Sequence, residues 1–233
     1  MDDDAFLPRL QTDLIAIQSV ALAGGPDLDR PVPTCPNWTV TDLLTHLWGV
    51  QSWAREIVRT RERAMVPVPH DDPTHAIADF VDGISNFLVA MRSVVADEDC
   101  WTFGPPPRKS GFWVRRQAHE HAVHRVDLES AFGTIPTFTP DFAADGVHEV
   151  VTMFYPRQLR SGRIEPVDGA IALHATDTGD TWQLGDGDPV ATVHAAAGDL
   201  YLGLWKRLDL LENSQLDGDR AAAERLLGRA ITP

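Results

Sequence analysis

The first 160 residues carry apolar side chains at intervals of three and four, the spacing that places them on one face of a helix. The first such stretch ends before Gly24-Gly25-Pro26, and residues 27–37 hold three prolines, which predicts an extended loop. Thr39, followed three residues later by Asp42, resembles a capping box at the start of the next helix. The five predicted helices span residues 4–23, 40–61, 74–95, 111–132 and 141–159.

From residue 162 the apolar positions alternate with polar ones, which is typical of strands with one buried face. The sequences Asp-Thr-Gly-Asp at 177–180 and Asp-Gly-Asp at 186–188 predict turns between these strands. We expect the strands to form an antiparallel meander, followed by two further helices. The predicted strands span residues 170–175, 181–184 and 189–195, and the helices span 198–208 and 220–230.

These patterns predict an α+β protein with two domains. A helical bundle is expected over residues 1–160, with the fifth helix leading away from it. A small α+β domain with an antiparallel sheet is expected over residues 161–233. A chain of 233 residues is long enough for each domain to bury a core of its own.

The composition narrows the range of partners. A formal net charge of −14 argues against nucleic acid and against anionic membrane surfaces, because both require clustered lysine and arginine. The start of the chain is acidic, and no apolar run approaches the roughly 18 residues of a membrane span, so we expect a cytoplasmic protein. The two cysteines, Cys35 and Cys100, provide neither a disulfide framework nor a Cys-x-x-Cys metal motif.

The fourth predicted helix carries an unusual pair of side chains. Glu120 and His124 are four residues apart and therefore lie on one face of the helix, with the apolar Trp113 nearby. A buried carboxylate without a partner costs several kcal/mol or changes its pKa, and a metal ion bound by both side chains would be the simplest partner. On the spacing alone, a solvated or ion-paired helix face remains an alternative.

His46 lies within the apolar stripe of the second predicted helix, close to Leu43 and Val50. A histidine in such a place is either a core residue satisfied by one hydrogen bond or a functional ligand. If the second and fourth helices pack in one bundle, His46 can face Glu120 and His124. Two imidazoles and one carboxylate leave one position of a tetrahedral zinc ion open, as in catalytic sites.

Three other features have simpler interpretations. Cys35 precedes a predicted helix, whose N-terminus lowers a thiol pKa, but no general base is visibly paired with it. His174 and His194 lie on predicted strands and are interpreted as ordinary sheet residues. The Pro-rich segment 104–110 is either a solvated connector or a wall of the site.

Three segments together resemble a known family. Residues 32–47, VPTCPNWTVTDLLTHL, and residues 115–127, RRQAHEHAVHRVD, resemble mycothiol-dependent maleylpyruvate isomerases of the DinB-like superfamily. Residues 199–207, DLYLGLWKR, are similar to the family's apolar helix that ends in Trp-x-Arg. The chain departs from the family pattern at Asn37 and Lys206, where glycine is common. The resemblance implies a DinB-like metal-binding four-helix bundle with a second domain that closes one side of the site.

By position, the resemblance assigns His46, Glu120 and His124 to the family's divalent-metal triad, which usually holds zinc. It matches Asp127 to a family position one turn beyond His124, from which a carboxylate can orient a ligand. It also matches Arg207 to an active-site arginine that can hold an anionic substrate or stabilise developing negative charge. Asp127 and Arg207 are therefore the candidate catalytic residues.

The resemblance further implies mycothiol as a thiol cosubstrate and a small electrophile as substrate. A metal-bound thiol is deprotonated and can attack an activated double bond. The thiol leaves again in an isomerase and stays attached in an S-transferase, and we leave both open. A metal enzyme of the same fold that uses no thiol, and a metal-binding regulatory protein without catalytic activity, remain alternatives. No oligomeric state is predicted.

Overall fold

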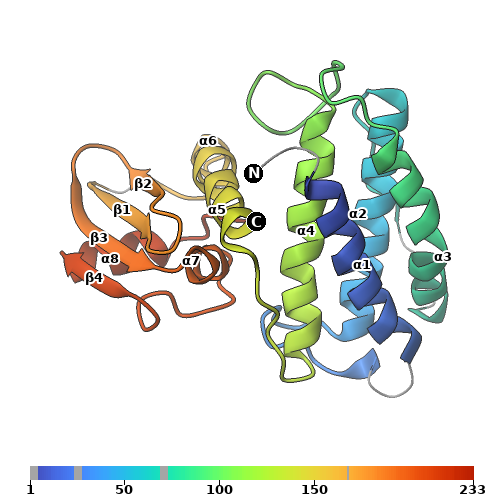
Figure 1. Ribbon diagram of the computed structural model, residues 1–233, viewed down its shortest axis with the longest axis horizontal. Helices are drawn as coiled ribbons and strands as arrows, with labels where there is room; N and C mark the ends of the chain where they lie inside the picture. The colour runs from blue at the N-terminus through green and yellow to red at the C-terminus, as the bar shows by residue number, and fades with distance from the viewer. Residues whose placement is uncertain (1–4, 24–27, 69–72, 167) are drawn as a thin grey trace. The chain divides into compact units, whose positions relative to one another are not determined.

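The computed structural model describes residues 5–23, 28–68, 73–166 and 168–233. The chain divides into two compact units, with the boundary between Pro136 and Thr137, and each unit is described by itself. Figure 1 shows the helices of residues 2–136 and the mixed helices and strands of residues 137–233.

The N-terminal unit is a four-helix bundle, as predicted (Figure 1). In this bundle α2 packs against α3 and α1 packs against α4, while α1 with α3 and α2 with α4 make further contacts. Buried leucines, isoleucines and aromatic residues from all four helices form the core. The helices are α1 (Phe6–Ala23), α2 (Val40–Thr60), α3 (Pro73–Arg92) and α4 (Gly111–Ser130), with ends within three residues of the predicted ones.

The capping box at the start of α2 is confirmed. The side chain of Thr39 accepts a hydrogen bond from the backbone N–H of Asp42, and the Asp42 carboxylate accepts one from the backbone N–H of Thr39 at 2.8 Å. The described part of the preceding loop, residues 28–39, is tightly closed, because the N–H of Val32 donates to the carbonyl of Trp38 at 2.9 Å. The N–H of Trp38 in turn donates to the carbonyl of Cys35 at 3.0 Å. This loop is therefore fixed to the beginning of α2.

The predicted fifth helix is interrupted. It consists of α5 (Pro140–Glu149), a π-helical turn (Val150–Phe154) and α6 (Tyr155–Arg160). Pro156 has no backbone N–H, so it cannot complete the ladder of i→i−4 hydrogen bonds. The N–H of Tyr155 instead donates to the carbonyl of Val150, five residues earlier.

The boundary between the two parts of the chain differs from the predicted one. The apolar pattern places residues 141–160 in a first domain spanning 1–160, but they belong to the compact unit that begins at Thr137. The reason is packing: α5 lies against α7 (Ala197–Leu204) of its own unit, with the ring of Tyr201 directly over Gly146. Apolar spacing along a helix does not reveal which neighbour covers the apolar face.

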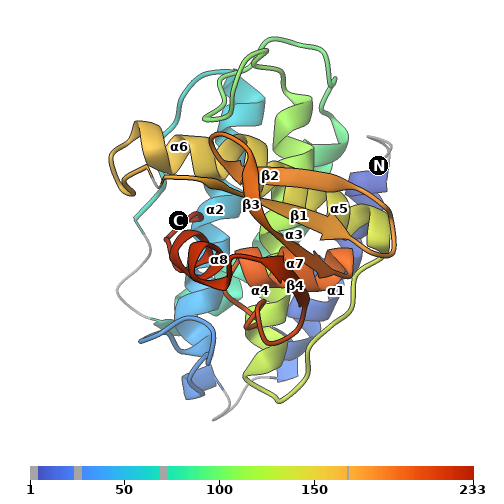
Figure 2. The same ribbon diagram turned by 90° about the vertical axis from the view of Figure 1, so that its left-hand side faces the viewer.

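The C-terminal unit contains a four-stranded sheet in the order β2-β1-β3-β4 (Figure 2). Its two outer pairs, β1 with β2 and β3 with β4, are antiparallel, but the central strands β1 and β3 are parallel, so the predicted meander is wrong. The helix α8 (Arg220–Leu227) packs on the central strands. The strands are β1 (Ala170–Ala175), β2 (Thr181–Gly185), β3 (Pro189–Ala195) and β4 (Gln215–Gly218).

Burial explains this strand order. Most side chains of β1 are buried, whereas β2 has one buried side chain and β4 has none, so the most buried strand is central and the strands with few buried side chains form the edges. The connection of residues 186–188 crosses the end of β1, since Gly185 and Pro189 both pair with Ala170. The strand β4 was not predicted, because it has only four residues and only one half-buried apolar side chain, Leu216.

Candidate metal centre

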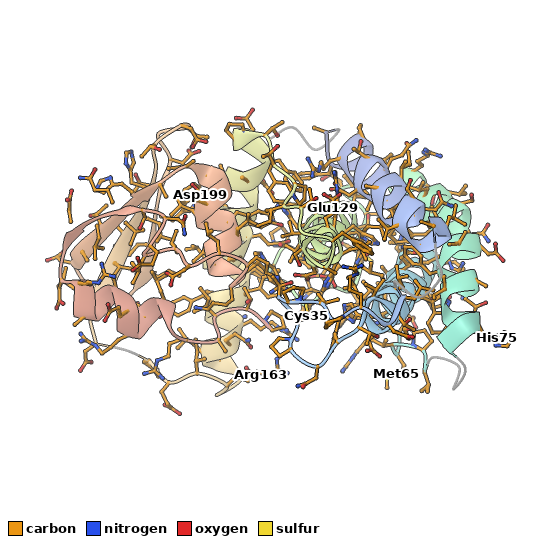
Figure 3. The ribbon with its side chains drawn as sticks, turned by 90° about the horizontal axis from the view of Figure 1, so that it is seen from below. Cys35, Met65, His75, Glu129, Arg163 and Asp199 are labelled. Atoms are coloured by element: carbon orange, nitrogen blue, oxygen red, sulfur yellow. The ribbon has the colours of Figure 1, made fainter. Side chains whose placement is uncertain are left out.

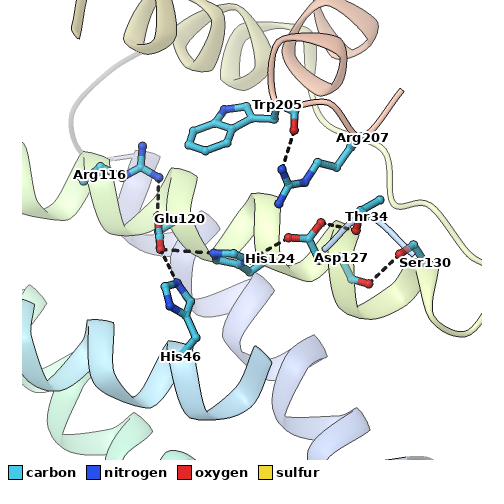
Figure 4. A network of polar contacts seen from close by, with 9 residues as sticks. All are labelled: Thr34, His46, Arg116, Glu120, His124, Asp127, Ser130, Trp205 and Arg207. Atoms are coloured by element: carbon cyan, nitrogen blue, oxygen red, sulfur yellow. Dashed lines mark hydrogen bonds and ion pairs between the residues drawn. The ribbon is translucent and has the colours of Figure 1, made fainter. Parts of the chain in front are cut away.

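The bundle brings the three predicted metal ligands together (Figure 4). Nε2 of His46, on α2, lies 3.2 Å from Oε1 of Glu120, on α4. Nε2 of His124 lies 3.4 Å from the same oxygen. One ligand atom from each residue lies within 4.8 Å of the other two.

These distances fit a single cation. Ligand atoms bound to one tetrahedral ion at about 2.1 Å are about 3.4 Å apart, which matches the contacts of Glu120 with both imidazoles. The side chain of His46 is 34% exposed, whereas those of Glu120 and His124 are 18% and 12% exposed. A ligand could therefore approach from the side of His46.

The electrostatics of the three residues are strongly coupled. Burial alone would raise the pKa of Glu120, but hydrogen bonds with His124 and His46, together with the positive charge of Arg116, hold it well below the ordinary value. Arg116 donates to the second carboxylate oxygen of Glu120 at 3.0 Å. The site thus offers an ionised carboxylate to a cation.

The pKa of His124 is also strongly perturbed. Burial opposes its protonation, but hydrogen bonds to Asp127 and Glu120 outweigh burial and raise its pKa to about 9. A proton on Nε2 of His124 and a metal ion would occupy the same place, because both are attracted by Glu120. Metal binding would therefore release this proton.

The other nitrogen of His124 is held by a carboxylate. Nδ1 of His124 lies 2.8 Å from Oδ2 of Asp127, whose side chain is fully buried, and Thr34 donates its hydroxyl to the other oxygen, Oδ1, at 2.6 Å. This contact directs Nε2 of His124 toward Glu120. The role of Asp127 in catalysis stays a prediction.

Two further residues of the 28–39 loop lie beside the histidines. The indole of Trp38 has its centre 5.1 Å from the ring of His46 and 6.3 Å from that of His124. The half-buried thiol of Cys35, labelled in Figure 3, forms a second group of possible metal ligands with His124 and Asp127. These neighbours of the thiol are distant in sequence, so no local pattern around Cys35 indicates them.

Thr34 and Trp38 were not predicted as site residues. Thr34 is 93 residues from Asp127, and loop residues follow no period from which a contact could be predicted. Both lie in the 32–47 segment that carries the family resemblance, which was the one available signal.

Arg207, the other candidate catalytic residue, lies in the C-terminal unit just beyond α7. Its Nη1 donates to the carbonyl of Trp205 at 2.5 Å, and with Lys206 and Glu224 it lines a cavity of about 480 Å³ within that unit. Its predicted contact with a substrate stays a prediction.

His174 and His194 contact each other across β1 and β3, with their Nδ1 atoms 3.0 Å apart.

Comparisons with known proteins agree with the sequence resemblance. A family model described as "Mycothiol maleylpyruvate isomerase N-terminal domain" matches residues 16–129, and one described as "MDMPI C-terminal domain" matches residues 141–225. No curated protein is significantly similar to the chain. Within the described residues, no helix has the length and apolar character needed to cross a membrane.

Two solved structures share the fold. The crystal structure of the mycothiol-dependent maleylpyruvate isomerase matches with a TM-score of 0.65 and 13% identity, and that of a histidine-to-alanine mutant with 0.63 and 11%. Each match covers 94% of this chain and 95% of the other. At this identity the two structures establish the fold alone.

Proposed function

Because the chain belongs to the mycothiol-dependent maleylpyruvate isomerase family, we propose that it is a metal-dependent enzyme that uses mycothiol to act on a small electrophile. The reaction is an isomerisation, or an S-transfer if the thiol stays attached to the substrate. The observation that carries the proposal is the convergence of two imidazole nitrogens and one carboxylate oxygen from α2 and α4.

His46 and His124 would bind the cation through Nε2, and Glu120 through Oε1. Two histidines and one carboxylate are a common ligand set of catalytic zinc, which makes zinc the first metal to test. When bound, such a cation lowers the pKa of a thiol at its open position, so that the thiolate is present at neutral pH.

Neighbouring residues have distinct parts in this proposal. Arg116 balances the charge of Glu120, and Asp127 keeps Nδ1 of His124 protonated. Trp38 offers an apolar face beside both histidines, against which a substrate or the thiol can pack. The half-exposed His46 leaves this side open to incoming molecules.

An isomerisation by thiol addition also requires a group that stabilises the negative charge formed on the substrate. Addition of the thiolate forms a C–S bond and moves the electron pair of the double bond onto a neighbouring carbonyl oxygen. Rotation about the new single bond follows, and return of the electron pair expels the thiolate. Arg207 is proposed to stabilise the negative charge on that oxygen or to bind a substrate carboxylate.

The first experiment compares the zinc content of the wild type, His46→Ala and His148→Ala. His148 is an exposed histidine of α5 outside the proposed site, so its variant controls for the loss of an imidazole. We expect one zinc per chain in the wild type and in His148→Ala. In His46→Ala, zinc affinity should fall more than about 100-fold, since loss of a direct ligand costs more than loss of an outer partner.

Titration of the zinc-bound wild type with mycothiol then tests the thiol. Binding with release of a proton is expected if the thiolate forms. A wild type that binds no zinc would contradict the proposal. Zinc binding without thiol binding would favour the alternative in which the open position activates water.

A further inference from the structure

Asp127 is a fully buried carboxylate with a hydrogen bond at each oxygen (Figure 4). Oδ2 accepts from Nδ1 of His124 at 2.8 Å, and Oδ1 accepts from the hydroxyl of Thr34 at 2.6 Å. Both distances are those of strong hydrogen bonds to an ionised group. The plane of the carboxylate is therefore fixed from two sides.

Removing one of these bonds would have consequences for the other. Loss of the Thr34 hydroxyl would take a short hydrogen bond from Oδ1, so the carboxylate would be held less firmly and could tilt or turn. Either movement changes the direction from which Oδ2 meets Nδ1 of His124. The imidazole would then be free to rotate, and Nε2 would lose its fixed direction toward Glu120.

Thr34 is itself held in place by the loop of residues 28–39. The N–H of Cys35 donates to the carbonyl of Val32 at 3.1 Å, and the loop is closed further by the bond between Val32 and Trp38. Thr34 thus connects a loop fixed to the start of α2 with α4, which carries His124. The same loop therefore places Trp38 beside both histidines and, through Thr34 and Asp127, holds Nδ1 of His124.

We propose that Thr34 is a positioning residue that orients His124 for metal binding through the Asp127 carboxylate. The proposal rests on the proposed function, because it requires His124 to be a metal ligand. The alternative is that the Thr34 hydroxyl only satisfies a buried charge and affects stability alone.

Three substitutions separate these roles. Thr34→Val keeps the shape of the side chain and removes the hydroxyl, whereas Thr34→Ser keeps the hydroxyl and removes the methyl group. Thr34→Ala also lacks the hydroxyl and replaces the valine variant if that variant does not fold. Thr12→Val is the matched control, because the exposed Thr12 hydroxyl donates to the carbonyl of Pro8 in its own helix.

Zinc affinity is measured by competition with a chromophoric chelator, and the geometry of the site by the visible absorption of bound Co²⁺. We expect Thr34→Val to bind zinc about tenfold more weakly, the lower end of the range for outer partners of a ligand, with altered Co²⁺ bands. Thr34→Ser and Thr12→Val should bind zinc within about twofold of the wild type, as neither loses the hydrogen bond to Asp127.

The outcomes distinguish the two proposals. If the wild type binds zinc and Thr34→Val binds it equally well with unchanged Co²⁺ bands, only the role of Thr34 is refuted. A lower free energy of unfolding in Thr34→Val without loss of zinc affinity also refutes that role alone. If the wild type binds no zinc, the proposed function fails and the positioning role fails with it.

Discussion

Asn37 and Lys206 both have left-handed backbone conformations, with φ of 70° and 63°. At both positions the family resemblance leads us to expect glycine. Lys206 follows the end of α7, where its N–H donates to the carbonyl of Gly203 and the N–H of Arg207 donates to that of Leu202. Such a helix end requires a left-handed residue, which costs any residue with a Cβ about 1 kcal/mol or more.

The strained conformation of Lys206 can be tested by substitution. Lys206→Gly should have a free energy of unfolding about 1 kcal/mol higher than Lys206→Ala, because both lose the lysine side chain and only alanine keeps the strained Cβ. Urea unfolding of the two variants measures the difference. In a right-handed helical position alanine would be the more stable, so a reversed order would contradict the conformation of Lys206.

Among single residues, part of the candidate site could be predicted from the sequence. The four-residue spacing of Glu120 and His124 fixes their common face once a helix is assumed. His46 could be added only on the assumption that two particular helices pack together, which α2 and α4 do. The contact of Thr34 with Asp127 depends on the path of a loop, and apolar periodicity contains no information about that path.

Among the elements, the contact of α5 with α7 depends on the absence of a side chain. A Cβ placed on Gly146 would lie 2.3 Å from the ring of Tyr201, a distance that no real contact allows. Tyr201 is fully buried, so its ring has no free space into which to move. The glycine in the middle of α5 is therefore required by packing, although it lowers the intrinsic stability of the helix.

We expect Gly146→Ala to lower the free energy of unfolding by about 1–3 kcal/mol, the usual cost of overpacking. Gly198→Ala in α7 is the matched control, because no atom lies within 4 Å of its added Cβ. That variant should be as stable as the wild type or up to about 1 kcal/mol more stable. Equal effects of the two substitutions on urea unfolding would show that the packing of α5 on α7 is not as described.

Local pattern predicted the elements well and their neighbours poorly. The helices of the bundle and the first three strands follow from periodicities of 3.6 and 2, which side chains impose within one element. The parallel pairing of β1 with β3 depends on the burial of β1 relative to the other strands. The pattern within a single strand does not contain that comparison. Pro156 is a visible cause of the π-helical turn. The apolar pattern runs through this proline without a break, so it predicted one continuous helix.

For the molecule as a whole, the net charge of −14 describes the surface and not the interior. The helix α4 buries Arg116, His119, His121 and Asp127 within the bundle. Buried ionisable groups change the pH dependence of stability whenever their pKa differs between the folded and unfolded chain. His121 gives the clearest case, because its ring is fully buried and its two nitrogens have defined partners.

His121 donates its Nδ1–H to the carbonyl of Gln117 at 2.8 Å, and its Nε2 accepts from the side-chain amide of Gln51 at 3.1 Å. Burial lowers its pKa from 6.5 to about 4. Between these values the unfolded chain binds a proton that the folded chain does not, so stability falls as the pH falls through this window. At pH 5.5 the loss should be about 1.3 kcal/mol relative to pH 7.5.

The variant His121→Asn isolates this contribution, since asparagine can donate to Gln117 but does not titrate. Urea unfolding of both proteins at pH 7.5 and 5.5, with a chelator to exclude metal ions, should show the wild type losing about 1.3 kcal/mol more than the variant. The other histidines are common to both proteins and cancel in this difference. The opposite result, in which the variant loses more unfolding free energy than the wild type between pH 7.5 and 5.5, would mean that a partner raises the pKa of His121 in the folded protein. The description of His121 as a neutral, buried side chain between α2 and α4 would then be wrong.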